Sequence, residues 1–99
     1  MYNIEFHEGV DKDFKDLGHR VTLLVYKKLK KLAQNPSIGD DLGNKANLDL
    51  SGLLKVYVDN KKVRIVYKII EKKVVIFVVA VGKRDAMEVY KKASNRINT

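Results

Sequence analysis

Two arginines and a tyrosine are the residues of this chain whose types and spacing most clearly suggest chemistry. Arg64 opens one apolar run and Arg84 follows the next, with a charged pivot at residues 71–73 between the runs. If the runs pair as antiparallel strands, Arg84 returns towards the level of Arg64. A guanidinium stays charged and presents a planar fork of donors that matches phosphate. The spacing therefore predicts a cleft that binds a phosphodiester, with Tyr90 six residues beyond Arg84.

Composition narrows the class of partner and the kind of site. The 99 residues include 20 Lys and Arg against 12 Asp and Glu, a formal net charge of +8 that favours nucleic acid or an acidic protein as partner. The absence of Cys and the two isolated His exclude disulfides, thiolate sites and a four-ligand zinc cage, so we expect no metal and no cofactor. With no signal-peptide pattern and no apolar run long enough to span a membrane, we expect one cytoplasmic domain, residues 1–99, without a membrane partner.

Apolar periodicity predicts the elements that must position the arginines. These elements are, in order, a strand (2–7), two helices forming a basic hairpin (8–17 and 20–33), three strands (54–58, 63–70 and 74–81) and a last helix (86–97). Residues 34–52 show little periodicity and are predicted to form an irregular surface segment, and Asp85 is the predicted N-cap of the last helix. The order β-α-α-β-β-β-α predicts an α+β fold, a small antiparallel sheet whose helices, including the amino-terminal helical hairpin, pack on one face.

Several of these segments also resemble a known family. The similarity is carried by Lys55, Val63-Arg64-Ile65-Val66-Tyr67, the strand Val74–Val79, Val81-Gly82-Lys83-Arg84 and Glu88-Val89-Tyr90. In these residues the chain resembles the RelE/ParE superfamily of toxins and is closest to the RelE branch. The resemblance covers nearly the whole chain and is densest from Leu53 to Ile97.

The resemblance implies a function and a set of partners. It implies the toxin of a type II toxin-antitoxin system, a ribosome-dependent endoribonuclease (mRNA interferase) that inhibits translation during stress by cutting mRNA in the ribosomal A site without a metal. Cleavage of RNA can use the 2′-hydroxyl as its nucleophile, so the protein has to manage protons and charge. The implied partners are the ribosome, mRNA and a cognate acidic antitoxin, with DNA contacted only through the toxin-antitoxin complex.

The same resemblance implies roles for individual residues. Arg64 would clamp the phosphate, Arg84 would stabilise the transition state or act at the leaving group, and Lys55 or Tyr90 would accept a proton. RNA-backbone contacts are expected from the basic residues Lys83, Lys27, Lys28, Lys30 and Lys31. RelE-like toxins usually carry two basic residues on the strand that here reads Leu54-Lys55-Val56-Tyr57, and Tyr57 stands where the second would be.

Other readings of these residues remain open at this stage. Arg64, Lys83 and Arg84 could be ordinary surface charges. Tyr90 could be a core ring, and the helical lysines could be a solvated face. One alternative function is a ParE-like toxin that poisons DNA gyrase without nuclease activity. The other, which Tyr57 keeps open, is an inactive member that only binds RNA or an antitoxin.

Overall fold

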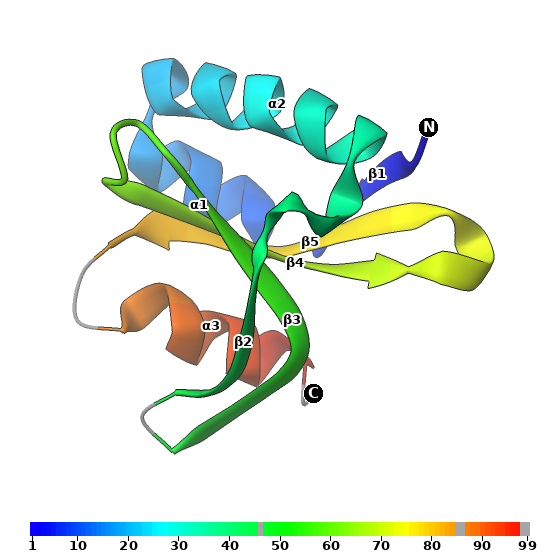
Figure 1. Cartoon of the computed structure of the whole chain (residues 1–99). Coiled ribbons are helices and arrows are strands. Elements are labelled where there is room, and N and C mark those ends of the chain that lie inside the picture. The colour runs from blue at the N-terminus through cyan, green and yellow to red at the C-terminus, as the bar shows by residue number, and fades with distance from the viewer. Residues whose placement is uncertain (46, 85–86, 98–99) are drawn as a thin grey trace.

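The chain folds into a five-stranded sheet with helices on both faces (Figure 1). The computed structural model describes residues 1–45, 47–84 and 87–97, so the predicted cap Asp85 lies outside the described residues. The helices and strands are β1 (Asn3–Phe6), α1 (Val10–Leu17), α2 (His19–Gln34), β2 (Asp40–Lys45), β3 (Leu48–Val58), β4 (Val63–Ile70), β5 (Val75–Lys83) and α3 (Glu88–Ile97), with short 3-10 turns at Pro36–Ile38 and Glu71–Lys73. The predicted α+β class is confirmed, and the predicted order of elements holds apart from one additional strand.

The sheet is mixed rather than wholly antiparallel. Its strand order is β1-β5-β4-β3-β2, and β1 pairs in parallel with β5, with Asn3 opposite Val75 and Phe6 opposite Val78. The other three pairings are antiparallel. The prediction of an all-antiparallel sheet is therefore wrong at one edge, because alternation shows that a strand exists but not which neighbour it takes. Here β1 occupies the edge of β5 that the β4–β5 hairpin leaves open.

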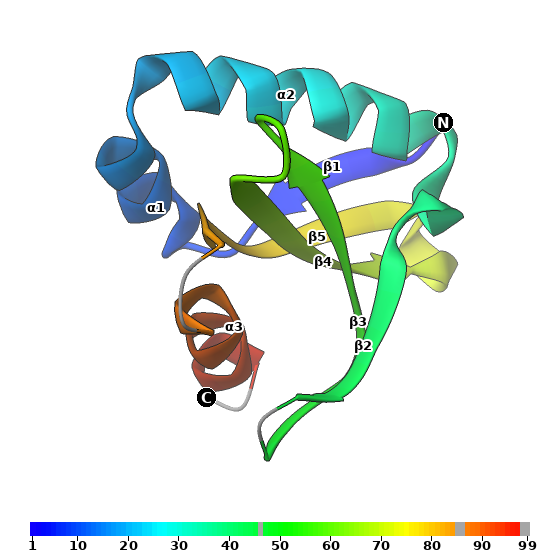
Figure 2. The same ribbon diagram turned by 60° about the vertical axis from the view of Figure 1, so that its left-hand side comes forward.

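The segment predicted to be irregular contains β2 and the beginning of β3. Figure 2 shows β2 and β3 running together as a curved ribbon past α3. Two leucines of this segment are buried, Leu42 at 5% and Leu50 at 1% exposure. The pairing shifts register between Asp41 and Gly43, where Gly43 has φ +59°. A short edge strand with an irregularity and polar neighbours loses its period of two, which explains why the sequence pattern did not reveal it.

Two hydrophobic layers enclose the sheet. On one face α1 packs through Val10 and α2 through Val25 and Leu29, which confirms the predicted amino-terminal hairpin. On the opposite face α3 packs through Val89 and Ala93, so the prediction that the helices share one face is wrong for α3. The central strands β4 and β5 are apolar on both faces and need a cover on each. A continuous apolar run does not indicate which helix covers which face.

A buried carboxylate ties α3 to α1 and β5. Asp13 of α1 is 1% exposed and accepts hydrogen bonds from Arg96 (2.7 Å), Lys92 (2.8 Å) and the Val81 N–H (3.0 Å). The Arg96 guanidinium also donates to one backbone carbonyl oxygen before α1 and one in β5. The β1–β5 pairing ends at Phe6 and Val78, so the Val81 N–H lies beyond it and takes the carboxylate as its acceptor. The position of α3 depends on this ion cluster.

Asp13→Ala should lower the free energy of unfolding by about 3 kcal/mol, because it leaves a partly buried guanidinium without its carboxylate. Urea unfolding followed by circular dichroism measures the change. Asp16→Ala is the matched control, since Asp16 lies on the same helix with a 57% exposed side chain. It should unfold close to the wild-type midpoint. Equal midpoints for Asp13→Ala and wild type would contradict the role given to this cluster.

The ion cluster also predicts how stability depends on pH. Burial alone would raise the pKa of Asp13, but hydrogen bonds from Arg96, Lys92 and the Val81 N–H hold it below its ordinary value of 3.8. The ionised carboxylate therefore stabilises the folded chain above pH 3.8, and this contribution is lost as pH falls through the lowered pKa. Between about pH 5 and about pH 2, wild type should lose more stability than Asp13→Asn in urea titrations. Parallel losses would argue against the lowered pKa.

Candidate functional site

Lys55, Tyr57, Arg64 and Tyr90 form a cluster between α3 and the sheet, referred to below as the basic–aromatic cluster. The Arg64 Cζ lies 4.5 Å from the ring centroid of Tyr90 and 5.8 Å from that of Tyr57. The Lys55 Nζ lies 4.0 Å from the Tyr57 ring centroid. Both distances to Arg64 are in the range of cation–π contacts. Three sequence-predicted site residues thus meet, together with Tyr57.

Strand alternation and one glycine assemble this cluster. Val56 and Val58 face α1 and α2, so Lys55 and Tyr57 point to the opposite face, where α3 lies. Tyr57 is directly opposite Arg64 in the β3–β4 ladder. On the other side Arg64 is opposite Gly82, where an added Cβ would lie 3.2 Å from the Cβ of Val89. The missing side chain lets α3 approach β5 closely and bring Tyr90 over Arg64.

The cluster carries more positive than negative charge. Among the described residues no ion pair involves Arg64, and its buried Nε has no hydrogen-bond partner. The Lys55 Nζ lies 3.6 Å from an Asp40 carboxylate oxygen, but the Asp40 side chain is 76% exposed while that of Lys55 is 14% exposed. A poorly solvated cation without a carboxylate is costly, and a bound anion would offset that cost. The geometry therefore suits a phosphate ligand.

The two tyrosines of the cluster differ in acidity. Interaction with the Lys55 ammonium, and then with the Arg64 guanidinium, holds the pKa of Tyr57 below 10.0. Burial raises the pKa of Tyr90 above 10.0, and the charges of Arg64 and Lys55 offset only part of that effect. Burial works to lower the pKa of Lys55, but the hydrogen bond and charge of Tyr57, with the charges of Tyr90 and Asp40, raise it above 10.5. Tyr57 is the more readily ionised tyrosine of the pair.

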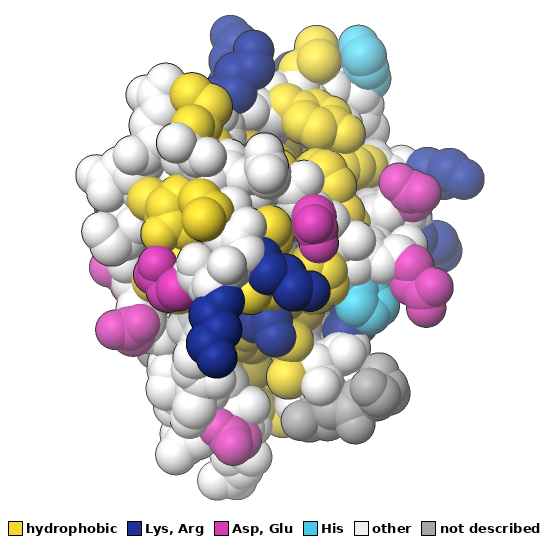
Figure 3. Space-filling model, turned by 90° about the vertical axis from the view of Figure 1, so that its right-hand side faces the viewer, with side chains coloured by type: hydrophobic (Ala, Val, Ile, Leu, Met, Phe, Trp, Pro, Cys, Tyr) yellow, Lys and Arg dark blue, Asp and Glu magenta, His cyan; other side chains and the backbone are white. Residues whose placement is uncertain are grey.

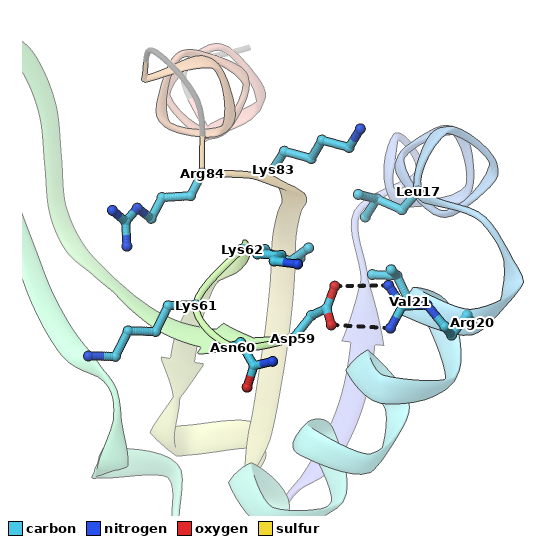
Figure 4. A pocket seen from close by; sticks show the side chains of 10 residues that line it. Leu17, Arg20, Val21, Asp59, Asn60, Lys61, Lys62, Lys83 and Arg84 are labelled. Carbon is cyan, nitrogen blue, oxygen red and sulfur yellow. Dashed lines mark hydrogen bonds and ion pairs between the residues drawn. The ribbon is translucent and has the colours of Figure 1, made fainter.

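Arg84 and Lys83 leave the end of β5 in opposite directions (Figure 4). Arg84 lies two residues beyond Gly82, the register partner of Arg64, and its N–H donates to the Lys62 carbonyl oxygen at 2.9 Å. Within the described chain, no ion pair or side-chain hydrogen bond involves its exposed guanidinium. Register puts Arg64 and Arg84 at one end of the β4–β5 pair, and a joint grip on one phosphate stays a prediction.

A basic pocket of about 700 Å³ opens beside Arg84. It lies between the α1–α2 junction and the β3–β4 turn, and Lys61, Lys62, Lys83 and Arg84 itself are among its lining residues. Arg20 clamps the turn with two hydrogen bonds of 3.1 Å to the Asp59 carboxylate. Lys83 therefore faces a cationic hollow on the α1–α2 side, separate from the basic–aromatic cluster.

Comparison with known proteins places the chain in a family. Residues 4–87 match the sequence profile described as "ParE toxin of type II toxin-antitoxin system, parDE". The chain belongs to this toxin family. It is 35% identical to the mRNA interferase toxin RelE of Escherichia coli K12 over 97% of both chains. The predicted superfamily is thereby confirmed.

Solved structures of E. coli RelE share the toxin fold. Free RelE with two arginine-to-alanine substitutions is 34% identical and superposes with a TM-score of 0.78 over 97% of both chains. The intact E. coli RelBE toxin-antitoxin complex matches with 30% identity and a TM-score of 0.70, over 87% of this chain and all of the matched one. The α+β fold described above is therefore the RelE fold.

The α2 lysines of this RelE-like chain lie apart from the basic–aromatic cluster. Lys27, Lys30 and Lys31 are exposed and Lys28 is half-buried. Their helix covers the face of the sheet opposite Arg64 and Tyr90. No ion pair among the described residues neutralises them, so they remain available to a polyanion. Their contact with RNA stays a prediction, but they do not line the cluster.

Sequence reasoning missed two residues of the site. Alternation along the strand predicts that Tyr57 shares a face with Lys55, but the sequence pattern gives Tyr57 no role in the site, and only the structure shows its contact with the Lys55 ammonium. Asp40 lies opposite Lys55 on β2, a strand that the sequence pattern does not predict. The described residues contain no group of three or more His, Cys, Asp or Glu that could hold a metal ion. None of the described helices is both long and apolar enough to cross a membrane.

The electrostatics of the cluster can be tested by tyrosine titration. Lys55→Gln and Arg64→Gln should each raise the pKa of Tyr57, because each removes a cation that favours the phenolate. The shift should be larger for Lys55→Gln, whose interaction with Tyr57 is the stronger. Ultraviolet absorbance of tyrosinate against pH measures the change, and Tyr57→Phe identifies which transition belongs to Tyr57. Superimposable titration curves for wild type and both variants would refute the assignment.

Proposed function

We propose that this chain is the toxin of a type II toxin-antitoxin pair and cleaves mRNA on the ribosome in the cytoplasm, with residues 1–99 acting as one domain. The observation that carries the proposal is the Arg64 guanidinium, held between the rings of Tyr57 and Tyr90 beside Lys55, with no carboxylate partner among the described residues. A phosphodiester supplies the missing negative charge. The relatives named mRNA interferase support the same activity.

Cleavage would proceed through the RNA's own 2′-hydroxyl. Its oxygen attacks the adjacent phosphorus in line and the 5′-oxygen leaves, which produces a 2′,3′-cyclic phosphate and a 5′-hydroxyl. Arg64 would bind the non-bridging oxygens, and Arg84 would reach the phosphate from the end of β5 and stabilise the charge that develops there. The raised pKa values of Lys55 and Tyr90 favour roles as a charged group and a hydrogen-bond donor over the proton acceptance predicted from the sequence.

Arg84→Ala should abolish toxicity while the fold persists, because the exposed guanidinium packs against no core. We expect a loss of about 3 kcal/mol of transition-state stabilisation, about 10²-fold in rate. Primer extension on ribosome-bound mRNA measures cleavage. Lys73→Ala, which removes an exposed cation in the turn between β4 and β5, is the control and should cleave like wild type. Unchanged cleavage by Arg84→Ala would remove Arg84 from the site.

Arg64→Ala should act similarly, and the double variant tests whether both arginines grip one phosphate. If they do, the combined loss in rate is smaller than the product of the two single losses. Single-turnover cleavage by the two single variants and the double variant gives the coupling. Multiplicative losses would indicate two separate sites.

A second candidate function is DNA gyrase poisoning without nuclease activity, because the matching profile is that of a ParE toxin. The two functions predict different damage after induced expression. New codon-spaced 5′ ends on mRNA support cleavage, whereas intact mRNA with broken DNA supports gyrase poisoning. A chain that is harmless when expressed alone would instead be an inactive binder of RNA or an antitoxin.

The cognate partner would be an acidic antitoxin, as the +8 charge and the RelBE complex of the E. coli relative support. An apolar groove of about 500 Å³ runs between the edge strand β1 and α2, with Ile4, Tyr26 and Leu29 in its lining and Lys30 among its residues. Figure 3 shows the side of the molecule where the chain begins, with patches of hydrophobic side chains among charged ones. An amphipathic helix with acidic residues would suit this groove, folding as it binds.

The antitoxin could silence the toxin by covering Arg64 and Arg84 or by displacing α3 and moving Tyr90. Displacement would break the Asp13–Arg96 ion pair and expose the backbone of α3. Hydrogen exchange of residues 88–97 in the complex separates the two: protection is lost only if α3 is displaced. Retained protection with blocked RNA binding would support direct cover.

A further inference from the structure

The basic–aromatic cluster contains one side chain with a suitable position and no role so far. Cleavage needs an acceptor for the 2′-hydroxyl proton within hydrogen-bond reach of the phosphate that Arg64 binds. Tyr90 is 2% exposed, with its ring covered by Arg64, and Lys55 is held between Asp40 and the Tyr57 ring. Tyr57 is partly exposed, and its ladder position is directly opposite Arg64.

We propose that Tyr57, as its phenolate, accepts the 2′-hydroxyl proton in the RNA cleavage proposed above, on which this inference rests. The phenolate oxygen takes the proton while the 2′-oxygen forms its bond to the adjacent phosphorus. The bond from phosphorus to the 5′-oxygen breaks, and its electron pair stays on the 5′-oxygen. A solvent water protonates the 5′-oxygen, and the hydroxide left behind removes the proton from Tyr57. The proton transfers cancel, and Tyr57 returns to its starting state.

The groups around Tyr57 favour its ionisation. Lys55 lies beside its ring on β3 and Arg64 faces it from β4, and both cations stabilise a phenolate. Facing the same space are Asp40 of β2, whose carboxylate is engaged by Lys55, and Tyr90 of α3, which is buried. The lowered pKa of Tyr57 agrees with this arrangement. A base that ionises below its ordinary range is also present in its active form at a larger fraction near neutral pH.

This role also accounts for the departure from the family pattern at Tyr57. The resemblance to RelE-like toxins implies a basic residue at this strand position, and this chain has Tyr57 there. A phenolate beside two cations can accept a proton. Tyr57→Phe removes only the hydroxyl and keeps the ring that contacts Lys55 and Arg64, so it separates proton transfer from packing.

Single-turnover cleavage of mRNA on programmed ribosomes tests the proposal. Tyr57→Phe should cleave about 10²-fold or more slowly, with its affinity for the ribosome unchanged. Tyr57→Lys, which restores the family's residue type, should recover cleavage above the level of Tyr57→Phe. Ser37→Ala, which removes a hydroxyl from an exposed side chain in the Pro36–Ile38 turn, is the control and should match wild type.

The pH profile separates a proton acceptor from a structural residue. The wild-type rate should rise with pH and level off below pH 10.0 as Tyr57 ionises, and Tyr57→Phe should lose that levelling. Fluorotyrosine at position 57 has a more acidic phenol and should move the levelling to lower pH without changing the fold. Cleavage by Tyr57→Phe at the wild-type rate, or a profile that fluorotyrosine leaves in place, would overturn the proposal while the ribonuclease function stands. A wild-type chain that cleaves no ribosome-bound mRNA would overturn the proposed function itself.

Discussion

Asp13 is the one charged residue, among those that the structure describes, to be almost completely withdrawn from solvent. A buried carboxylate is tolerated only if strong donors surround it, and here they come from α3 and from the backbone of β5. The two donors from α3, Lys92 and Arg96, stay in place only while α3 remains docked against the sheet. The position of Tyr90 over Arg64 therefore depends on the ion pair that joins Arg96 of α3 to Asp13 of α1.

The position of α3 also depends on a glycine in β5, which allows the helix to approach the strand closely. Gly82 has no side chain at the point where β5 meets Val89, so the helix can lie against the strand that pairs with Arg64. The cluster that results is not optimised for stability, because Lys55 and Arg64 are packed near one another with little compensating negative charge. Aromatic faces offset part of this cost. An arrangement of this kind is expected where function requires a pre-formed anion site.

The basic–aromatic cluster combines a lysine and a tyrosine, Lys55 and Tyr57, on one strand. A lysine and a tyrosine on one strand differ from two basic residues, because the phenol becomes an anion when it loses its proton and neighbouring cations favour that anion. The structure brings Tyr57 against Lys55 and Arg64, so the two cations that would bind RNA in the proposed function also increase the acidity of the phenol. Binding charge and proton chemistry are thus coupled in one small cluster.

The sequence by itself determined the family, the α+β class, the helical hairpin and the placement of Arg64 and Arg84 at the ends of two adjacent strands. These follow from local periodicity and from residues close together along the chain. Tertiary structure alone decided the parallel partner of β1, the existence of β2, the face covered by α3 and the meeting of Tyr57 with Arg64 and Tyr90. The physical reason is that β4 and β5 are apolar on both faces. Their sequence pattern is therefore compatible with α3 on either face of the sheet. Long-range packing and the buried Asp13 cluster decide which face α3 covers.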